Sequence, residues 1–473
     1  GDHRELHSFP TRRSSDLRAV EKAVEATGMH GVRMDRVSGR VYPERALAAH
    51  LVGFVGTENR GLAGAEAAFD QLLAADPNKA VGSYAYGDAV YLTIDADLQF
   101  RLESLGRQAL KENSAEALAL VAVEARTGAV LAYVSLPDFD PNTFLSADRS
   151  TWVDRVSMYA YEPGSVFKVY SMASLMALGG IDERSTFLCD GAYEHSTASG
   201  EDIVIKCLGT HGRVNLTNIL EYSCNAGAAY ASDTVSTIDF YAKIREFGFA
   251  ERPGADLSGE NPGLMRRPEE WSGRTKPTIA IGQELLVTAM QMAGAATVIA
   301  NGGILVRTRT LGRIVSPDGV TVDNPQPIVV RRVMEERDAK AVLGAMEASV
   351  LESGTGRRAR IEDLRMSVKT GTAQMIDPAT RRYSDTDFIA STIALFPGEA
   401  PEYIVYAAIF KPKGASIFGG RIAAPLVRDA ANIIADLYGV ARSDTQTLSH
   451  SGRIVVSGDR KSTRLNSSHG KLT

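Results

Sequence analysis

The sequence predicts a mixed α/β (α+β) protein in which an antiparallel sheet is flanked by helices. Three observations predict this class. Two strand-like runs meet at a turn at 126–128. Three further strand-like runs follow one another over 366–373, 389–396 and 403–410. Apolar helices precede these strands, and a last helix over about 423–438 follows them.

The composition is that of an ordinary soluble globular protein, with 44% apolar and 23% charged residues. The 473 residues leave room for two or three domains of roughly 100–200 residues each. The net charge of -5 gives no sign of a nucleic-acid partner. No run approaches the ~18–20 continuous apolar residues of a membrane span, and no signal peptide is visible.

The two ends differ from the rest of the chain. Residues 1–17 and 459–473 are polar, serine-containing and without periodicity, and they resemble translated adapter sequence. We therefore expect 1–17 to be a non-native tail and 443–473 to be disordered or non-native, with the natural start of the protein lying upstream. Between the tails we expect a small, incomplete domain over 18–85 and a main domain over 86–442.

The first elements are short and the later helices are apolar. GLAGAEAAFDQLLA predicts a short amphipathic helix, which ends before the Asp-Pro-Asn at 76–78 because proline disfavours helix in the residue before it. A strand is predicted over 89–94 and a helix over about 95–111. Two strongly apolar helices are predicted over 165–178 and 284–300, and such helices are expected to be buried.

Ser165 and Lys168 place a hydroxyl and an amine on one face of the first apolar helix. The hydroxyl lies at the helix start, where free N–H groups favour developing negative charge. A serine is a good nucleophile only when a neighbour removes its proton. Lysine can do so if burial or another cation lowers its pKa, and the apolar helix provides the burial. Alone the pattern is weak, since Ser468 and Lys471 in the polar tail repeat it.

Ser223 and Asn225 belong to a second motif, Ser-Cys-Asn, at the end of NLTNILEYSCN. The hydroxyl could relay a proton between a lysine and a leaving group, and the amide could hold a lysine or a substrate carbonyl. Standing alone, the tripeptide would be better interpreted as a polar corner between two helices.

The third motif is the Lys-Thr-Gly-Thr at 369–372, inside a predicted strand. A glycine between two hydroxyl residues lets a substrate lie against the strand edge. The Lys369 amine and the threonine hydroxyls suit a substrate carboxylate, and Lys369 could also lower the pKa of Lys168. The backbone N–H of Thr372 could join that of Ser165 as an oxyanion hole. An exposed strand beside a turn is the alternative for this motif taken alone.

The three cysteines, Cys189, Cys207 and Cys224, are too few for a disulfide framework, and none belongs to a Cys-x-x-Cys pair. The sequence therefore predicts neither a zinc site nor a redox site. At most one disulfide can form, and Cys189 with Cys207 is the better-placed pair, although two buried thiols would look the same. Whether Cys224 only packs between its two site neighbours is left open.

The three motifs follow the order Ser-x-x-Lys, Ser-x-Asn and Lys-Thr-Gly, which is the ordered set of serine β-lactamases and penicillin-binding proteins. Over residues 33–440 the chain resembles a class B penicillin-binding protein. RVYPERALAAHLVGFVG and GLAGAE resemble the pedestal of that family, and LTIDADLQ resembles the start of its catalytic domain. Val166 departs from the family, which often has threonine there.

The resemblance implies a serine β-lactamase-like transpeptidase domain with a partial pedestal domain. Ser165 would attack the penultimate D-alanine carbonyl of a peptidoglycan stem peptide, release D-alanine and pass the acyl group to a neighbouring amine. β-Lactams would acylate the same serine, and no metal or organic cofactor is required. The implied catalytic residues are Ser165, Lys168, Ser223, Asn225 and Lys369, and the implied substrate-binding residues are Thr370, Gly371 and Thr372.

The resemblance also implies partners and a location. These are a membrane glycosyltransferase and cell-wall scaffold proteins, at the outer, periplasmic face of the bacterial cytoplasmic membrane. The family's membrane anchor helix is not found in this sequence.

Three alternatives remain open. A β-lactamase or D,D-carboxypeptidase would use water as the acceptor, but the N-terminal module argues against it. A non-catalytic β-lactam sensor on the same fold would need a signalling module, and no segment outside the two domains is a candidate. A generic α/β-hydrolase is disfavoured because the body of the chain has no Gly-x-Ser-x-Gly elbow.

Overall fold

The computed structural model describes residues 14–28, 39–81, 84–197, 200, 202–377, 379–442, 447–448 and 454–455. By its internal contacts the chain divides into two units, Gly1–Val41 and Tyr42–Thr473. The described helix of the first unit is α1 (Ser14–Ala26), and all the predicted site residues lie in the second unit.

The two predicted tails lie mostly outside the described residues. What is described of them is the start of α1 and a pair of two-residue strands, β17 (Thr447–Leu448) and β18 (Ile454–Val455). Their non-native origin stays a prediction.

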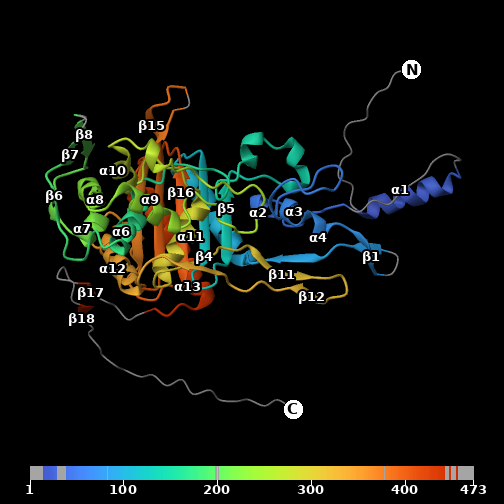
Figure 1. The fold of residues 1–473 in the computed structure, drawn as a ribbon. Helices are drawn as coiled ribbons and strands as arrows, with labels where there is room; N and C mark the ends of the chain where they lie inside the picture. The colour runs from blue at the N-terminus through green and yellow to red at the C-terminus, as the bar shows by residue number, and fades with distance from the viewer. Residues whose placement is uncertain are drawn as a thin grey trace, which may run out of the picture. The chain divides into compact units, whose positions relative to one another are not determined.

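The centre of the second unit is a five-stranded antiparallel sheet in the order β14-β15-β16-β4-β5 (Figure 1). It confirms the predicted sheet, including the turn at 126–128 that joins β4 to β5. β4 and β16 are buried along almost their whole length, which explains their continuous apolar sequences. The strands are β4 (Ala117–Glu124), β5 (Val130–Leu136), β14 (Ser367–Ile376), β15 (Tyr383–Phe396) and β16 (Tyr403–Phe410).

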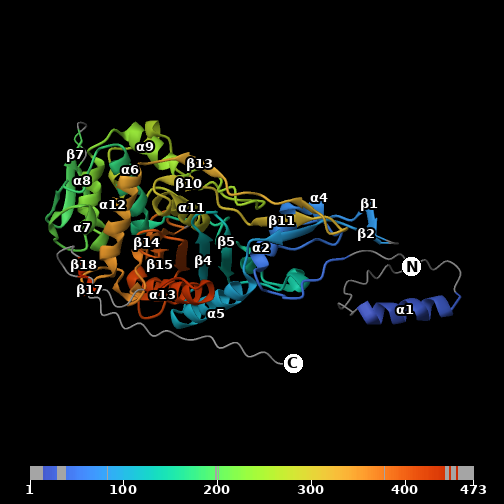
Figure 2. The same cartoon turned by 90° about the horizontal axis from the view of Figure 1, so that it is seen from below.

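Helices cover both faces of this sheet (Figure 2). α5 (Ala96–Glu112) and α13 (Gly419–Tyr438) pack on one face, around alternate side chains of the strands. α11 (Ala289–Ala300) packs on the other face, and α6 (Lys168–Ala177) belongs to the same apolar cluster. Asp95 begins α5 by accepting hydrogen bonds from the first-turn N–H groups, as the predicted helix start requires. The two apolar helices are therefore buried as predicted.

The predicted helix over 284–300 is wrong in its first five residues. Leu286 and Val287 are extended and form isolated bridges with Leu264 and Tyr161. The helix begins only at Ala289, after Thr288 and Gln291 form a reciprocal capping box. The apolar sequence continues through this boundary because both the bridge residues and the helix are buried.

The segment before the central domain is built from short elements. Its helices α3 and α4 confirm the predicted short helix, and β1 begins at Asp76, where that helix was expected to have ended. Phe54 packs against Phe139 and Phe144, and Glu103 accepts a hydrogen bond from the Ala48 N–H. The elements are α2 (Ala49–Val52), α3 (Gly64–Ala68), α4 (Asp70–Leu73), β1 (Asp76–Val81), β2 (Tyr84–Tyr86) and β3 (Ala89–Leu92). The domain boundary at residue 85 stays a prediction.

A group of small elements gathers at one end of the sheet, on the left of Figure 1. β6 pairs with β9, and β7 pairs with β8. The elements are β6 (Phe187–Cys189), β7 (Ala192–Ser196), β8 (Asp202–Lys206), β9 (Gly212–Val214), α7 (Leu216–Glu221) and α8 (Asn225–Ser232). The Ser-Cys-Asn motif lies between α7 and α8, at the predicted corner.

The remaining elements complete the second unit. The helices are α9 (Thr237–Glu246), α10 (Thr275–Ala280) and α12 (Glu336–Glu347), and the strands are β10 (Ile304–Val306), β11 (Leu311–Val315), β12 (Thr321–Asp323) and β13 (Val329–Arg332). The 3-10 helices are η1 (Pro141–Ser146), η2 (Arg149–Trp152), η3 (Gly164–Phe167), η4 (Pro268–Glu270), η5 (Ala348–Val350) and η6 (Arg357–Ala359). Within the described ranges, no helix combines the length and the apolar character needed to cross a bilayer.

Candidate active site

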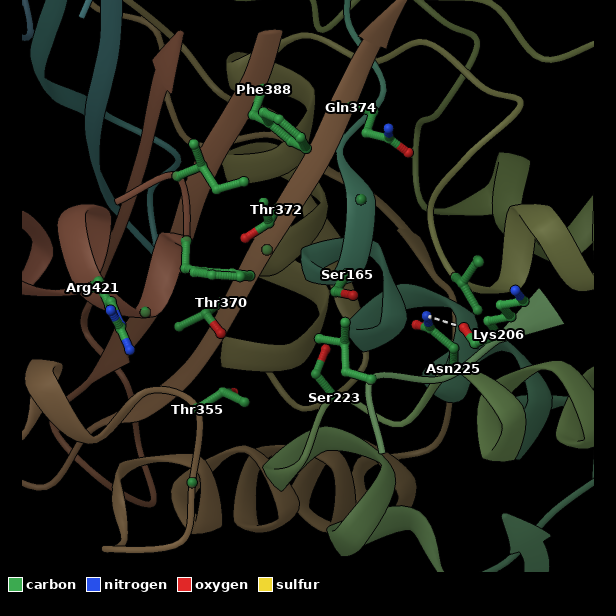
Figure 3. A pocket seen from close by; sticks show the side chains of 18 of the residues that line it. Ser165, Lys206, Ser223, Asn225, Thr355, Thr370, Thr372, Gln374, Phe388 and Arg421 are labelled. Atoms are coloured by element: carbon green, nitrogen blue, oxygen red, sulfur yellow. Dashed lines mark hydrogen bonds between the residues drawn. The ribbon is translucent and has the colours of Figure 1, made fainter. Parts of the chain in front are cut away.

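A cleft of about 890 Å³ opens beside β14, the edge strand of the sheet. Its volume is that of a site for a ligand of drug or peptide size. Figure 3 shows β14 on one side of the nucleophile candidate and the corner between α7 and α8 on the other. The predicted site residues that line the cleft are Ser165, Ser223, Asn225, Thr370, Gly371 and Thr372. The folding of the chain therefore brings all three motifs to one place.

Ser165 is the second residue of η3, which continues directly into α6. Gly164 before it has a φ of 60°, a conformation that glycine adopts without strain. A Cβ at Gly164 would also lie 3.0 Å from the Ala373 Cβ on β14. The Pro-Gly pair before Ser165 thus turns the chain into the helix and holds the hydroxyl against the edge strand.

Lys168 lies behind Ser165 and is wholly buried. Its Nζ is 2.9 Å from the Ser165 Oγ, 2.9 Å from the Ser223 carbonyl oxygen and 2.6 Å from the Asn225 Oδ1. Burial lowers the pKa of Lys168 to about 8. A neutral amine can donate to the carbonyl and to the amide oxygen and still offer its lone pair to the Ser165 hydroxyl. The geometry therefore suits removal of the serine proton.

Ser223 lies between the two lysines. Its Oγ is 2.9 Å from the Lys369 Nζ and 3.4 Å from the Lys168 Nζ, so one hydroxyl links both amines. The residue has a φ of 58°, in the left-handed region that non-glycine residues seldom occupy. Such a conformation persists only where its surroundings hold it, and at this corner it turns α7 into α8.

Lys369 differs from the sequence-based expectation. It is wholly buried, and its Nζ donates to Ser223 and to the Thr370 carbonyl oxygen at 2.8 Å, so it does not face a ligand in the cleft. Burial lowers the pKa of Lys369 first, and the neighbouring Lys168 lowers it further. The two buried amines therefore disfavour each other's positive charge.

β14 approaches the nucleophile helix closely at Gly371. A Cβ there would lie 2.8 Å from the Val166 Cγ2 and 3.0 Å from the Val166 backbone nitrogen. Only glycine allows this approach, and it keeps the strand edge open beside Ser165. Thr370 and Thr372 flank the glycine on the cleft wall, and the Thr372 hydroxyl accepts a hydrogen bond of 3.1 Å from the Gly419 N–H.

The rim of the cleft is basic, which the sequence did not indicate. Its charged residues are Lys206, Arg274, Arg357, Arg358 and Arg421, with Glu352 as the acidic residue. The whole chain carries a net charge of -5, so this positive charge is local. It favours an anionic ligand. Apart from the adjacent Arg357 and Arg358, these residues are far apart in sequence and have no spacing signal, so only the fold brings them together.

The cysteines also depart from the prediction. All three are free thiols, and their sulfur atoms lie with a ring nitrogen of His211 within 4.8 Å of one another. The Cys207 and Cys224 sulfurs are 3.9 Å apart, so the expected preference for a Cys189–Cys207 pair is not seen. Cys207 and His211 lie on the loop between β8 and β9, whereas Cys189 and Cys224 come from other segments, so no local Cys-x-x-Cys spacing could signal the cluster.

The model of a known family, the penicillin binding protein transpeptidase domain, matches residues 118–432. The chain belongs to this family. The matched transpeptidase region contains the central sheet except Ala117, the first residue of β4, and it contains every site residue predicted from the sequence. The predicted family resemblance and the predicted fold class are thus confirmed.

Relatives and solved structures agree with this membership. Stage V sporulation protein D of Bacillus subtilis is 30% identical over 436 residues, which are 88% of this chain and 66% of that protein. The probable peptidoglycan D,D-transpeptidase FtsI of Caulobacter vibrioides is 30% identical over 432 residues, 89% of this chain and 70% of that protein. The chain therefore spans about two thirds of the length of these two curated relatives.

The fold is that of solved penicillin-binding proteins. Penicillin-binding protein 3 of Mycobacterium tuberculosis in its apo form has a TM-score of 0.78 and 28% identity, covering 86% of this chain and 92% of that one. The same protein complexed with aztreonam has a TM-score of 0.77 and 28% identity, covering 86% of this chain and 91% of that one.

Proposed function

We propose that this chain is a peptidoglycan D,D-transpeptidase that works through an acyl-enzyme on Ser165. The observation that carries the proposal is the contact of 2.9 Å between the Ser165 Oγ and the Nζ of the buried Lys168, at the wall of a basic cleft. Membership of the transpeptidase family and relatives that are named peptidoglycan D,D-transpeptidases support it.

In the first half-reaction, neutral Lys168 accepts the Ser165 proton while the Oγ attacks the carbonyl of the penultimate D-alanine. The backbone N–H groups of Ser165 and Thr372 stabilise the oxyanion that forms. When the C–N bond breaks, the proton passes from Lys168 through the Ser223 hydroxyl to the amine of the departing D-alanine. Lys369 donates a hydrogen bond to the Ser223 Oγ. The Ser223 hydroxyl proton therefore points away from Lys369 and toward the departing amine.

In the second half-reaction, the amine of a neighbouring stem peptide attacks the ester on Ser165. Its proton leaves through Ser223 and Lys168, the C–Oγ bond breaks, and Ser165 recovers its hydroxyl. Asn225 holds Lys168 in place throughout, because its Oδ1 accepts from the amine and its Nδ2 donates to the Lys206 carbonyl at 3.0 Å (Figure 3). A β-lactam enters the same first step, since its strained amide takes the place of the D-alanine peptide bond.

The basic rim fits the substrate class. Stem peptides carry carboxylates, including the terminal one that leaves with D-alanine, and arginine binds carboxylates well. We further propose that the protein acts at the outer face of the bacterial cytoplasmic membrane, beside a membrane glycosyltransferase and scaffold proteins. That is where uncross-linked stem peptides would be supplied.

The molecule that accepts the acyl group from Ser165 distinguishes a transpeptidase from the alternative enzymes. We expect a donor peptide ending in D-Ala-D-Ala, given with an amine acceptor, to yield D-alanine and a cross-linked product detected by mass spectrometry. Products that contain only the hydrolysed donor would indicate a D,D-carboxypeptidase. Rapid loss of a penicilloyl adduct would indicate a β-lactamase, whereas the proposal expects the adduct to persist.

A further inference from the structure

Four potential metal ligands meet beneath the corner that carries Ser223 and Asn225. The residues are Cys189 at the end of β6, Cys207 directly after β8, His211 just before β9 and Cys224 at the start of α8. Cys189 and Cys224 are buried, and the other two are half-buried. None of the four takes part in the proposed acyl transfer.

The distances fit a tetrahedral site. With Zn–S of about 2.3 Å and Zn–N of about 2.0–2.1 Å, ligand atoms at the corners of a tetrahedron lie about 3.5–3.8 Å apart. The Cys207 and Cys224 sulfurs are 3.9 Å apart, and the His211 Nδ1 is 3.4 Å from the Cys189 sulfur and 3.5 Å from that of Cys207. A disulfide would need sulfur atoms at about 2.03–2.05 Å. Three of the six distances are therefore close to those around a shared ion, and all six are within 4.8 Å.

Two of the three sulfurs accept hydrogen bonds from backbone N–H groups, as thiolates do. The Asn225 N–H points to the Cys207 sulfur at 3.3 Å, and the Gly227 N–H points to the Cys224 sulfur at 3.2 Å. Such N–H groups orient and stabilise metal-bound thiolates. The His211 ring stacks on Tyr222, with 5.4 Å between ring centroids, and this fixes the direction of its Nδ1.

We propose that Cys189, Cys207, His211 and Cys224 bind one zinc ion. Three sulfurs and one imidazole form a closed structural set with no position left for a substrate. Soft sulfur ligands favour zinc over magnesium or calcium, which prefer oxygen. The ion binds three thiolates, so the thiol protons are released to solvent on binding.

The ion fixes the position of the turn between α7 and α8, which carries Ser223 and Asn225. Cys224 lies between Ser223 and Asn225, and the Asn225 backbone N–H contacts the Cys207 sulfur while its side chain holds Lys168. The metal thereby joins β6, the ends of β8 and β9, and α8 behind the position of Lys168. Its importance for acylation rests on the proposed function, whereas its binding does not.

Elemental analysis of the purified full chain tests the site. We expect about one zinc per chain in the wild type, and at least about a tenfold loss in Cys207→Ser and His211→Ala. His195→Ala is the matched control, because His195 is exposed and outside the cluster, and it should keep its zinc. Ser165→Ala should also keep it, which separates metal binding from acyl transfer.

Wild-type protein provides a test that needs no ligand variant. After chelation, addition of Co²⁺ should produce the thiolate charge-transfer and visible bands of tetrahedral cobalt. Labelling by fluorescent penicillin should fall at least about tenfold on zinc removal and return with zinc. If the chelated wild type showed no cobalt–thiolate band after Co²⁺ is added, the proposed zinc site would be wrong. A Cys207–Cys224 disulfide in the native protein would also contradict it. Zinc removal that leaves labelling unchanged would overturn its positioning role.

Discussion

At the residue scale, the site depends on which hydrogen bonds the Lys168 amine donates and which it accepts. Two of its neighbours, the Ser223 carbonyl and the Asn225 side-chain oxygen, can only accept hydrogen bonds. The Ser165 hydroxyl is the nearest neighbour that can donate, at 2.9 Å against 3.4 Å for the Ser223 hydroxyl. The neutral amine satisfies the three shortest contacts with Ser165 as the donor, whereas the ammonium has no lone pair to receive the serine proton. Acylation should therefore follow the neutral form of Lys168.

The pH dependence of acylation tests this assignment. Below about pH 8 we expect the second-order rate constant with a penicillin to rise about tenfold per pH unit, and above it to level off. The reason is that burial lowers the pKa of Lys168 to about 8, and deprotonation generates the base. Stopped-flow fluorescence measures the profile, and a rate that falls through this range would contradict the assignment.

Glu162→Gln provides the control for this profile. Burial raises the pKa of Glu162 to about 7, so this carboxyl titrates close to the lysine. Its Oε1 accepts from the Glu284 N–H and from the Tyr383 hydroxyl, away from the Lys168 amine. The substitution should leave the rise toward pH 8 in place, and a profile that disappears with it would assign the titration to Glu162 instead.

The sequence indicated which residues come together in the site better than it indicated their surroundings. Ser165, Lys168, Ser223 and Asn225 were predictable because their spacing within short motifs reflects contacts along one helix or one corner. The direction of the Lys369 side chain was not predictable, because it is set by a hydrogen bond to Ser223, which is 146 positions away. The cysteine cluster and the arginine rim were missed for the same reason.

At the element scale, the site is a contact between an edge strand and a helix start. β14 has β15 on one side, where Gly371 pairs with Ser391, and the nucleophile helix on the other. The glycine sets the separation, because any side chain there would meet Val166. The strands and helices themselves were predictable from periodicity and apolar runs. The extended residues before α11 were not predictable, because a continuous apolar run fits a buried strand as well as a buried helix.

Gly371→Ala tests this contact. The added methyl group overpacks against Val166 and the Ser391 hydroxyl at 2.8 Å, so we expect a loss of about 1–3 kcal/mol in the free energy of unfolding. Penicillin labelling should fall with it, because β14 must shift from Ser165. Denaturant unfolding and labelling measure the two effects.

Gly344→Ala is the matched control. It lies exposed inside α12, and an added Cβ there meets no atom within 4 Å. In a helix interior alanine should raise the free energy of unfolding by about 0.5–1 kcal/mol and leave labelling unchanged. If Gly371→Ala behaved like this control, the close approach of the strand would not be needed for the reaction.

At the scale of the whole molecule, the central sheet separates two apolar cores, and the cleft lies where its edge strand meets helices of one core. The second unit extends from Tyr42 to the C-terminal end, so the small N-terminal elements and the catalytic domain share it. The chain is acidic overall, but the cleft is basic. A local positive charge on an acidic chain draws an anionic ligand to the cleft.

The central claim is that this whole arrangement serves one acylated serine. The most direct measurement is intact-protein mass spectrometry after exposure to penicillin, followed by peptide mapping, on the wild type and on Ser165→Ala. The wild type should gain the mass of one penicillin on the peptide that contains Ser165, and the folded Ser165→Ala protein should gain none. An adduct on another residue, or an adduct that persists in Ser165→Ala, would contradict the claim.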